Sequence, residues 1–148
     1  MRLAAASGVA RLDLDTIAWE AGKIAVARDP IIARDQVERF CRARSDWIVE
    51  GCYASLIAPT LAFRPHLLFL DPGLAQCVQN CHDRPWEPHK YRSSIGQNER
   101  LGFLIDWVKD YYVRQGELSL AGHQALFDAY RGPKQRLGTL PGPDFRPV

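Results

Sequence analysis

Two short apolar runs in the middle of the chain set the expected fold. Residues 47–49 (WIV) and 66–70 (HLLFL) are apolar without strict alternation, and an acid follows each run, Glu50 and Asp71. Such runs are typical of strands buried on both faces, as in a parallel sheet under helices. Because ligands of open α/β sheets bind beyond the carboxyl ends of the strands, Glu50, Gly51 and Asp71 lie where chemistry is expected.

Other strands and helices are expected on either side of these runs. Residues 9–14 read as a strand, and Asp29-Pro30 is a favourable helix start, because Asp caps the helix and Pro fits its first turn. The alternation predicts an α/β fold with parallel strands and right-handed crossovers. The other expected elements are a helix from Pro30 with a buried stripe at Val37, Phe40 and Cys41, a short helix ended by Pro59, a helix from Pro72-Gly73 that packs on the sheet through Leu74, Cys77, Val78 and Cys81, helices over 97–113 and 119–130, and an edge strand over 134–137.

Composition favours one soluble domain, expected over residues 1–138 with a loose tail at 139–148. The 148-residue chain is 47% hydrophobic and 24% charged, which is enough for one core. Its formal net charge of +2 is too small to indicate general binding to nucleic acids or membranes. With no apolar run of about eighteen residues and no signal peptide, we expect a cytoplasmic protein. The four cysteines match no standard zinc spacing and are expected to be reduced.

Paired acids end the first expected strand. In LDLD the aspartates alternate with leucines, so Asp13 and Asp15 project to the same side. In one interpretation, the two carboxylates bind a shared cation. In the other, Asp15 only caps the following helix and Asp13 is only solvated. Spacing leaves both interpretations open. Glu50 is likewise a site residue or a loop residue, and Gly51 either admits a ligand close to the backbone or makes a turn. For Asp71, directly before Pro72, capping of the next helix is the favoured role.

Basic side chains gather in two places. Residues 82–94 (HDRPWEPHKYRSS) are rich in proline, aromatics and bases, which indicates an ordered surface loop. Arg84, Lys90 and Arg92 are suited to phosphate oxygens, and a merely solvated loop is the alternative. The second group, on the outward face of the helix from Pro30, is typical of a solvated face and consists of Arg39, Arg42 and Arg44.

Three segments occur in a characteristic order: LDLDTIAW, WIVEGCY, and HLLFLD, which is followed by a cysteine-containing helix and an arginine-bearing loop. Together they resemble the small P-loop kinases of the adenylate kinase and shikimate kinase group. The nearest branch is that of the topology-modulation or adenylate-kinase-like ATPases. The resemblance, over roughly residues 1–115, implies a three-layer parallel sheet with flanking helices. It also implies ATP and Mg²⁺ as cofactors and phosphoryl transfer to a small-molecule acceptor, or ATP hydrolysis.

The resemblance also implies roles for individual residues. Asp13 would lie near the magnesium ion without binding it directly. Asp15 would contact the acceptor hydroxyl or act as the base. The acceptor pocket would be lined by Glu50, Gly51 and Tyr53, and the lid arginines that close over the transferring phosphate would be Arg84 and Arg92.

One large element of those kinases has no counterpart in the sequence. They begin with a strand and a Gly-x-x-x-x-Gly-Lys-Ser/Thr loop that holds the nucleotide phosphates. Ala21-Gly22-Lys23 follows the first expected strand and lacks the other residues of that motif. Residues 1–7 (MRLAAAS) favour a helix that ends at Gly8. In those kinases the helix that follows the phosphate-binding loop would continue at this position. We therefore expect an N-terminally truncated kinase-like chain with very weak or no turnover. Either Met1 is an internal methionine of a longer protein, or the chain has truly lost its front.

The competing hypothesis is a non-catalytic relative. Such a protein would bind an acidic ligand, a protein partner or nucleic acid through the basic patches. Nucleic acid is the weaker choice, because aromatic residues do not alternate with the bases in a stripe. Neither the acceptor nor the oligomeric state follows from the sequence.

Overall fold

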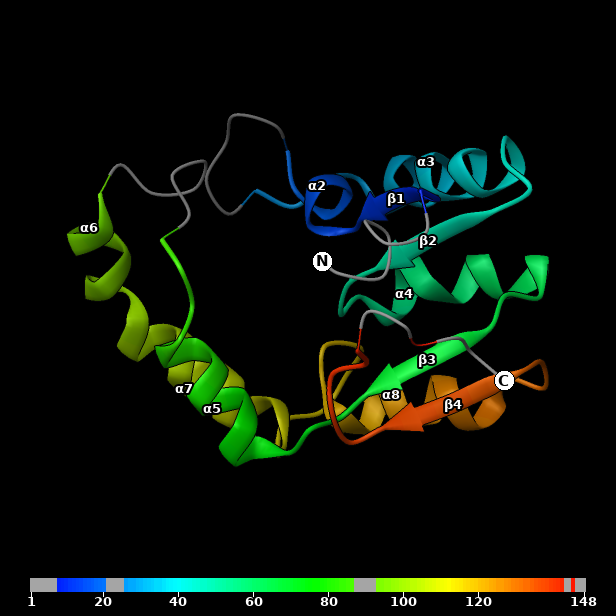
Figure 1. Cartoon of the computed structure of the whole chain (residues 1–148). Helices are drawn as coiled ribbons and strands as arrows, with labels where there is room; N and C mark the ends of the chain where they lie inside the picture. Colours follow the sequence, from blue (N-terminus) through cyan, green and yellow to red (C-terminus); the bar gives the residue numbers. More distant parts are fainter. Residues whose placement is uncertain (1–7, 21–25, 87–92, 143–144, 146–148) are drawn as a thin grey trace.

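The computed structural model describes residues 8–20, 26–86, 93–142 and 145. Its strands form two parallel pairs: β1 (Ala10–Asp13) with β2 (Trp47–Glu50), and β3 (Leu67–Leu70) with β4 (Lys134–Leu137). In Figure 1 the arrowheads of these strands point to the same side, in the order β1, β2, β3, β4. The predicted mixed α/β class and parallel pairing are confirmed, including the pairing of the short strand at 134–137.

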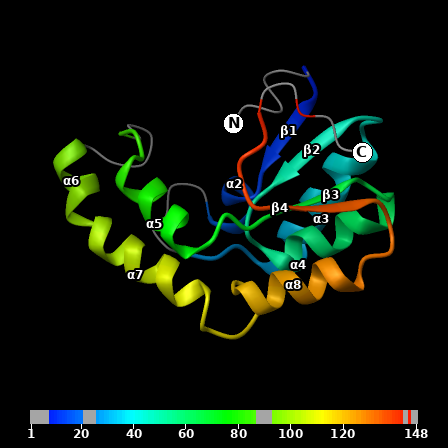
Figure 2. The ribbon, with the colours of Figure 1, turned by 60° about the horizontal axis from the view of Figure 1, so that its bottom comes forward.

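Helices cover the strands from one side. The longest of them, α3 (Pro30–Arg42), begins as predicted, because the Asp29 side chain accepts hydrogen bonds from the first two free amides of the helix. It lies on the same side of the strands as α4 (Ala54–Ile57) and α8 (Leu120–Ala129) (Figures 1 and 2). In the described residues the helices over the strands lie on this side, and the expected third layer stays a prediction.

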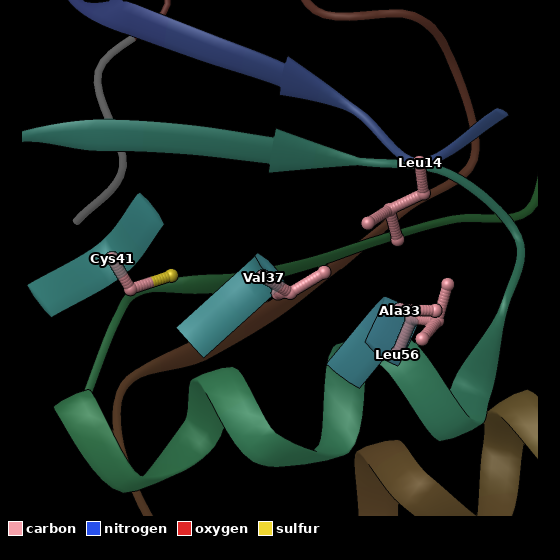
Figure 3. Close-up of a cluster of buried hydrophobic side chains, with 5 residues drawn as sticks. All are labelled: Leu14, Ala33, Val37, Cys41 and Leu56. Carbon is pink, nitrogen blue, oxygen red and sulfur yellow. The ribbon is translucent and has the colours of Figure 1, made fainter. Parts of the chain in front are cut away.

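The main apolar cluster lies between α3 and the first strand pair. Its buried members come from the end of β1, from α3 and from α4, and Figure 3 shows their side chains converging. The predicted stripe of α3 is confirmed, since Val37 and Cys41 are buried and Phe40 packs against the cluster. Full burial of such a side chain contributes about 1.5–3 kcal/mol. The cluster consists of Leu14, Ala33, Val37, Cys41 and Leu56.

Three further helices form an arm beside the strands (Figure 1): α5 (Leu74–His82), α6 (Ser94–Glu99) and α7 (Leu101–Tyr111). The prediction that α5 packs on the sheet is wrong, because its main partner is α7. Cys77, Val78 and Cys81 are half-buried, and Leu74 is 40% exposed. Helical periodicity identifies the apolar side of a helix but not the element that covers it.

One predicted helix boundary is wrong and another is confirmed. The helix expected over 97–113 is divided at Arg100 into α6 and α7, and Ser93 caps α6 by accepting a hydrogen bond from the Gly96 amide at 3.1 Å. The short helix expected to end at Pro59 is α4, which ends at Ile57 just before that proline, and the chain continues as the 3-10 helix η1 (Ala58–Phe63). Proline is compatible there because the first turn of a helix needs no amide from that position.

The last two elements match their predictions. The expected helix over 119–130 is α8, capped by Ser119, and the expected strand over 134–137 is β4. Lys134 holds the end of α8 by donating hydrogen bonds to the carbonyls of Phe127 at 2.6 Å and Tyr130 at 2.7 Å. A cation at the C-terminal end of a helix also interacts favourably with the helix dipole. The helices of the described ranges are all too short or too polar to cross a bilayer. The helix expected over residues 1–7 and half of the tail, residues 143–144 and 146–148, lie outside the described residues.

Candidate functional site

The strand-end acids of the first sheet stand side by side. The parallel register pairs Asp13 of β1 with Glu50 of β2. Neighbouring carboxylates repel each other, and Arg11 offsets this repulsion. Its guanidinium lies 3.4 Å from Asp13 Oδ2 and also pairs with Glu50 Oε1. Two acids and one arginine therefore share the carboxyl-terminal edge of this strand pair.

Asp15 is oriented by a chain of hydrogen bonds. The Tyr53 hydroxyl donates to Asp15 Oδ1 at 2.7 Å, and the indole N–H of Trp19 donates to the Tyr53 oxygen at 2.9 Å. Burial, and then the hydrogen bond to Asp15, raise the pKa of Tyr53 well above its ordinary value. The phenol therefore stays protonated and keeps donating to the carboxylate.

Asp13 shapes the turn that presents Asp15. Its Oδ1 accepts a hydrogen bond from the Asp15 amide at 3.0 Å, and its backbone carbonyl accepts one from the Thr16 hydroxyl at 2.7 Å. A side chain that bonds the amide two residues ahead makes an Asx turn. Asp15 lies in the first turn of α2 (Asp15–Ala18). Its carboxylate is therefore held at the surface, where a solute can reach it.

Gly51 is required by the packing of the backbone against Leu14. Its φ of 149° disfavours other residues, and a Cβ at this position would lie 2.7 Å from Cβ of the buried Leu14. These observations support the turn interpretation, and a role of Gly51 in an acceptor pocket stays a prediction. Because Gly51 has no side chain, the backbone can approach Leu14 closely and turn from β2 toward Tyr53. Gly51 therefore contributes to the site by allowing this turn.

The two lid arginines are not brought to this cluster by the described contacts. Arg84 follows α5 on the arm, which Figures 1 and 2 place apart from β1 and β2. Arg92 and Lys90 lie outside the described residues. The site as described therefore consists of Asp13, Asp15, Glu50 and Tyr53, with Gly51 supporting the turn.

Sequence reasoning missed Arg11 and Trp19. Alternation along a strand does place Arg11 on the same side as Asp13, so the signal for Arg11 was present in the pattern ARLD. Trp19 is separated from Tyr53 by 34 positions, and no local pattern connects them. Only the folded chain shows that Trp19 supports the tyrosine that holds Asp15.

The second strand-end acid is used differently. Asp71 follows β3, and its carboxylate pairs with Arg136 of β4 and accepts a hydrogen bond from Tyr112 at 3.3 Å. The prediction that Asp71 caps α5 is wrong, since the N-cap position is Gly73 and no side chain caps that helix. Asp71 joins the second strand pair to the arm.

A magnesium ion fits the site only indirectly. One Asp13 oxygen accepts the Asp15 amide and the other faces Arg11. The described residues contain no cluster of three or more side chains that would bind a metal. Mg²⁺ commonly keeps several waters and adds substrate phosphates to one or two carboxylates. The residues present agree with an outer, water-mediated position for Asp13 and do not form a protein-only magnesium site.

Comparison with protein-family models, with curated proteins and with solved structures gives no match for this chain. The geometry of the strand-end residues therefore carries the functional argument.

Proposed function

We propose that the strand-end cluster is the acceptor end of a P-loop kinase-like phosphotransfer site, in a three-layer fold of that type. The observation that carries this proposal is the orientation of Asp15 by Tyr53 next to Asp13 and Glu50. These residues follow two paired parallel strands, at the edge where open α/β sheets bind their ligands. The expected acceptor is a small molecule with a hydroxyl group.

Asp15 is the base in this proposal. Its exposed carboxylate would accept a hydrogen bond from the acceptor hydroxyl and take the proton. Tyr53 would keep the carboxylate in one orientation, and Trp19 would keep Tyr53 in place. Glu50, whose side chain is 14% exposed and bound by Arg11, is better suited to shaping the pocket than to proton transfer.

The residues described here do not fit the phosphates of ATP. Phosphate cradles use a glycine-rich loop and a lysine, and neither occurs at the ends of the described strands. When bound, ATP would supply the phosphoryl group and Mg²⁺ would neutralise its charge. Residues 1–148 alone should therefore bind Mg-ATP weakly and turn it over very slowly or not at all.

The non-catalytic alternative has weaker support. The arginines of α3 are already engaged on their own helix: Arg39 pairs with Asp35 at 2.5 Å, and Arg42 lies 3.8 Å from Glu38. Arg44 stacks on Phe40, with its guanidinium 4.2 Å from the ring centre. A polyanion would have to displace these partners, so we expect no retention on a polyanion column at physiological salt.

Calorimetric titration with Mg-ATP and an assay of ADP release test the proposal. They should be applied to the 148-residue chain and to a chain extended by the residues encoded in frame upstream of Met1. We expect turnover only in the extended chain. There, Asp15→Asn should lower turnover by about 100-fold or more while Mg-ATP affinity changes little. The matched control is Asp35→Asn, an exposed acid of α3.

Two results would contradict the proposal in different ways. ATP turnover by the 148-residue chain would show that no additional phosphate loop is needed. Unchanged turnover in Asp15→Asn would remove Asp15 from the mechanism. If the extended chain neither binds nor hydrolyses ATP, the kinase-like function is rejected and the binding alternative takes its place.

A further inference from the structure

A small hollow lies at the edge where the second strand pair begins. Its volume is about 230 Å³, and it is lined by residues that precede β3 and β4: Arg64, Tyr130, Arg131 and Gly132. The arrowheads in Figure 1 point away from this edge, because both strands start there and run parallel. The candidate site lies at the carboxyl-terminal edge of the first pair, so the hollow is separate from it.

Contacts between the two segments fix the walls of the hollow. The Leu67 amide donates to the Pro133 carbonyl at 2.9 Å, which joins the beginnings of β3 and β4. Tyr130 is 8% exposed, and its hydroxyl donates to the Pro65 carbonyl at 2.5 Å. The tyrosine ring passes close over Gly132, where a Cβ would lie 2.1 Å from the tyrosine oxygen. The segments that carry the two arginines are therefore held side by side.

The two arginines of the hollow carry charge that no acid balances. Both residues are exposed, and in the described part of the chain neither guanidinium has a hydrogen-bond or ion-pair partner. The described arginines that do pair with acids are Arg11, Arg34, Arg39, Arg42, Arg114 and Arg136. Like charges around one hollow repel each other, and an anion between them offsets this repulsion. Arg64 and Arg131 are thus available to an external anion.

Arg64 has a backbone conformation that arginine disfavours. Its φ of 55° and ψ of 47° lie in the left-handed region, and among the described residues other than glycine it alone has a positive φ. Glycine is the usual residue at such a position after a helix, and a residue before proline is usually extended. Strained positions of this kind are concentrated at ligand-binding sites. A binding role of the side chain would explain why arginine occupies this one.

The charges around the hollow also favour an anion. Helix α8 ends directly before Tyr130, and the last carbonyls of a helix carry partial negative charge. Lys134 offsets this charge, because its ammonium donates to three carbonyls at this end, the nearest at 2.6 Å. The acid nearest in sequence to Arg131 is Asp128, whose carboxylate accepts a hydrogen bond from Gln124 at 2.8 Å and pairs with neither arginine of the hollow. The local charge is therefore positive.

We propose that the hollow binds a phosphomonoester group, with the guanidinium groups of Arg64 and Arg131 on its oxygens. A guanidinium offers several N–H donors in a fork that matches phosphate oxygens. Two such cations balance the dianion of a phosphomonoester, whereas a carboxylate would leave one charge unbalanced. The hollow is smaller than the sites of about 300–1,000 Å³ that enclose drug-sized ligands. It therefore suits one anionic group of a small molecule whose remainder extends into solvent.

Titration of the 148-residue chain with methyl phosphate, followed by residue-resolved amide NMR, tests the proposal. The ionic strength is held constant, and at about pH 8 the phosphomonoester is a dianion. We expect saturable shifts at the amides of Arg64, Arg131 and Gly132, with a Kd on the order of 1 mM. Arg64→Gln and Arg131→Gln should each weaken binding by about 10-fold, because each removes charge-assisted hydrogen bonds. The matched control is Arg100→Gln, since Arg100 is an exposed arginine of the arm whose guanidinium likewise has no described partner.

Arg64→Gly separates ligand binding from the role of this residue in the turn. Glycine adopts the left-handed conformation without strain, so the Tm without phosphate should stay the same or rise. The affinity for methyl phosphate should nevertheless fall by about 10-fold, as in Arg64→Gln. Wild-type affinity in Arg64→Gly would show that Arg64 only ends η1, and the proposal would be rejected.

Four other results would overturn the proposal. The first is the absence of saturable shifts around the hollow up to about 50 mM methyl phosphate, far above the expected Kd. The second is equal affinity for acetate, which would assign the hollow to any small anion. The third is tighter binding of a single-stranded oligonucleotide with a salt dependence of several counterions, which would assign the arginines to a nucleic-acid surface. The fourth is an equal loss of affinity in Arg100→Gln, which would show that only the net charge of the chain matters.

Discussion

The two strand pairs are stabilised by different kinds of contact. The first pair packs on α3 and α4 through Leu14, Val37 and Leu56, with exposures of 0%, 0% and 6%. The second pair is joined to the arm by the hydrogen bond from Tyr112 to Asp71, which also pairs with Arg136, and it packs on α8 through Phe69 and Phe127, whose ring centres are 5.7 Å apart. His123 of α8 contacts the Tyr111 oxygen of α7 and the Cys52 carbonyl that follows β2. No residue described in α5, α7 or α8 is fully buried.

This difference determines how each region responds to change. Apolar burial is non-directional and depends mainly on the area removed from water. A hydrogen-bonded pair depends on distance, angle and protonation. The first pair should therefore respond to loss of side-chain volume and hardly to pH, whereas the second should respond to single polar atoms and to protonation.

The largest effect is expected for Leu14→Ala. This side chain is fully buried and fills the space beside Gly51, so its truncation leaves a cavity in the main cluster. We expect a loss of about 3 kcal/mol in the free energy of unfolding, or roughly 6–12 °C in Tm. Urea denaturation and calorimetry measure it. Ile31→Ala, at a position 78% exposed, is the matched control and should change the free energy of unfolding by less than about 0.5 kcal/mol. Similar losses in the two variants would show that this cluster is not the core.

A smaller effect is expected for Asp71→Asn. The substitution keeps the shape of the side chain but removes the charge that pairs with Arg136 and weakens the acceptor of the Tyr112 hydroxyl. We expect a loss of about 1–2 kcal/mol in the free energy of unfolding. Asp106→Asn is the control, because Asp106 is 79% exposed and its pairing with Lys109 spans 3.6 Å. If the midpoint urea concentration of unfolding is the same for both variants and the wild type, Asp71 does not join the second strand pair to the arm.

The same contrast explains what could be predicted from the sequence. The stripe of Val37 and Cys41 was predictable because helical periodicity is local. The partner of Asp71 was not, since Arg136 lies 65 positions away and nothing in either segment specifies the other. The packing of α5 on α7 was missed for the same reason: both helices show an apolar side, and two such sides do not reveal which surfaces meet.

The candidate site shows the same division. Its acids were predictable from their position at strand ends, because the carboxyl ends of parallel strands lie at one edge. That Asp13 and Glu50 lie side by side became visible only with the strand register. The hydrogen bond between Asp15 and Tyr53 joins residues 38 positions apart, which no local pattern predicts. Residue types at a site are thus visible in the sequence, whereas their mutual orientation depends on long-range pairing.

The smallest effect, and the one that depends on pH, is expected at His123, which joins α8 to α7 and to the Cys52 carbonyl beyond β2. Its Nε2 lies 3.0 Å from the Cys52 carbonyl and therefore donates to it, which leaves Nδ1, 2.8 Å from the Tyr111 oxygen, to accept. Burial raises the pKa of Tyr111 to about 12, so this hydroxyl remains a donor. Burial also lowers the pKa of His123 below its ordinary value, so the folded chain holds the imidazole neutral.

The sign of the pH dependence follows from that lowered pKa. Between the lowered pKa and about 6.5, the unfolded chain binds a proton at position 123 more readily than the folded chain. The stability that the neutral ring contributes is therefore present above about pH 6.5 and is lost as the pH falls through this window. We expect His123→Gln to have a lower Tm than the wild type at pH 8 and a smaller difference at pH 5. His82→Gln, at an exposed position of α5, should follow the wild type at every pH. A Tm difference for His123→Gln that stays constant from pH 8 to pH 5 would mean that the ring does not titrate in this range, and the pH sensitivity assigned to the second region would have to come from another group.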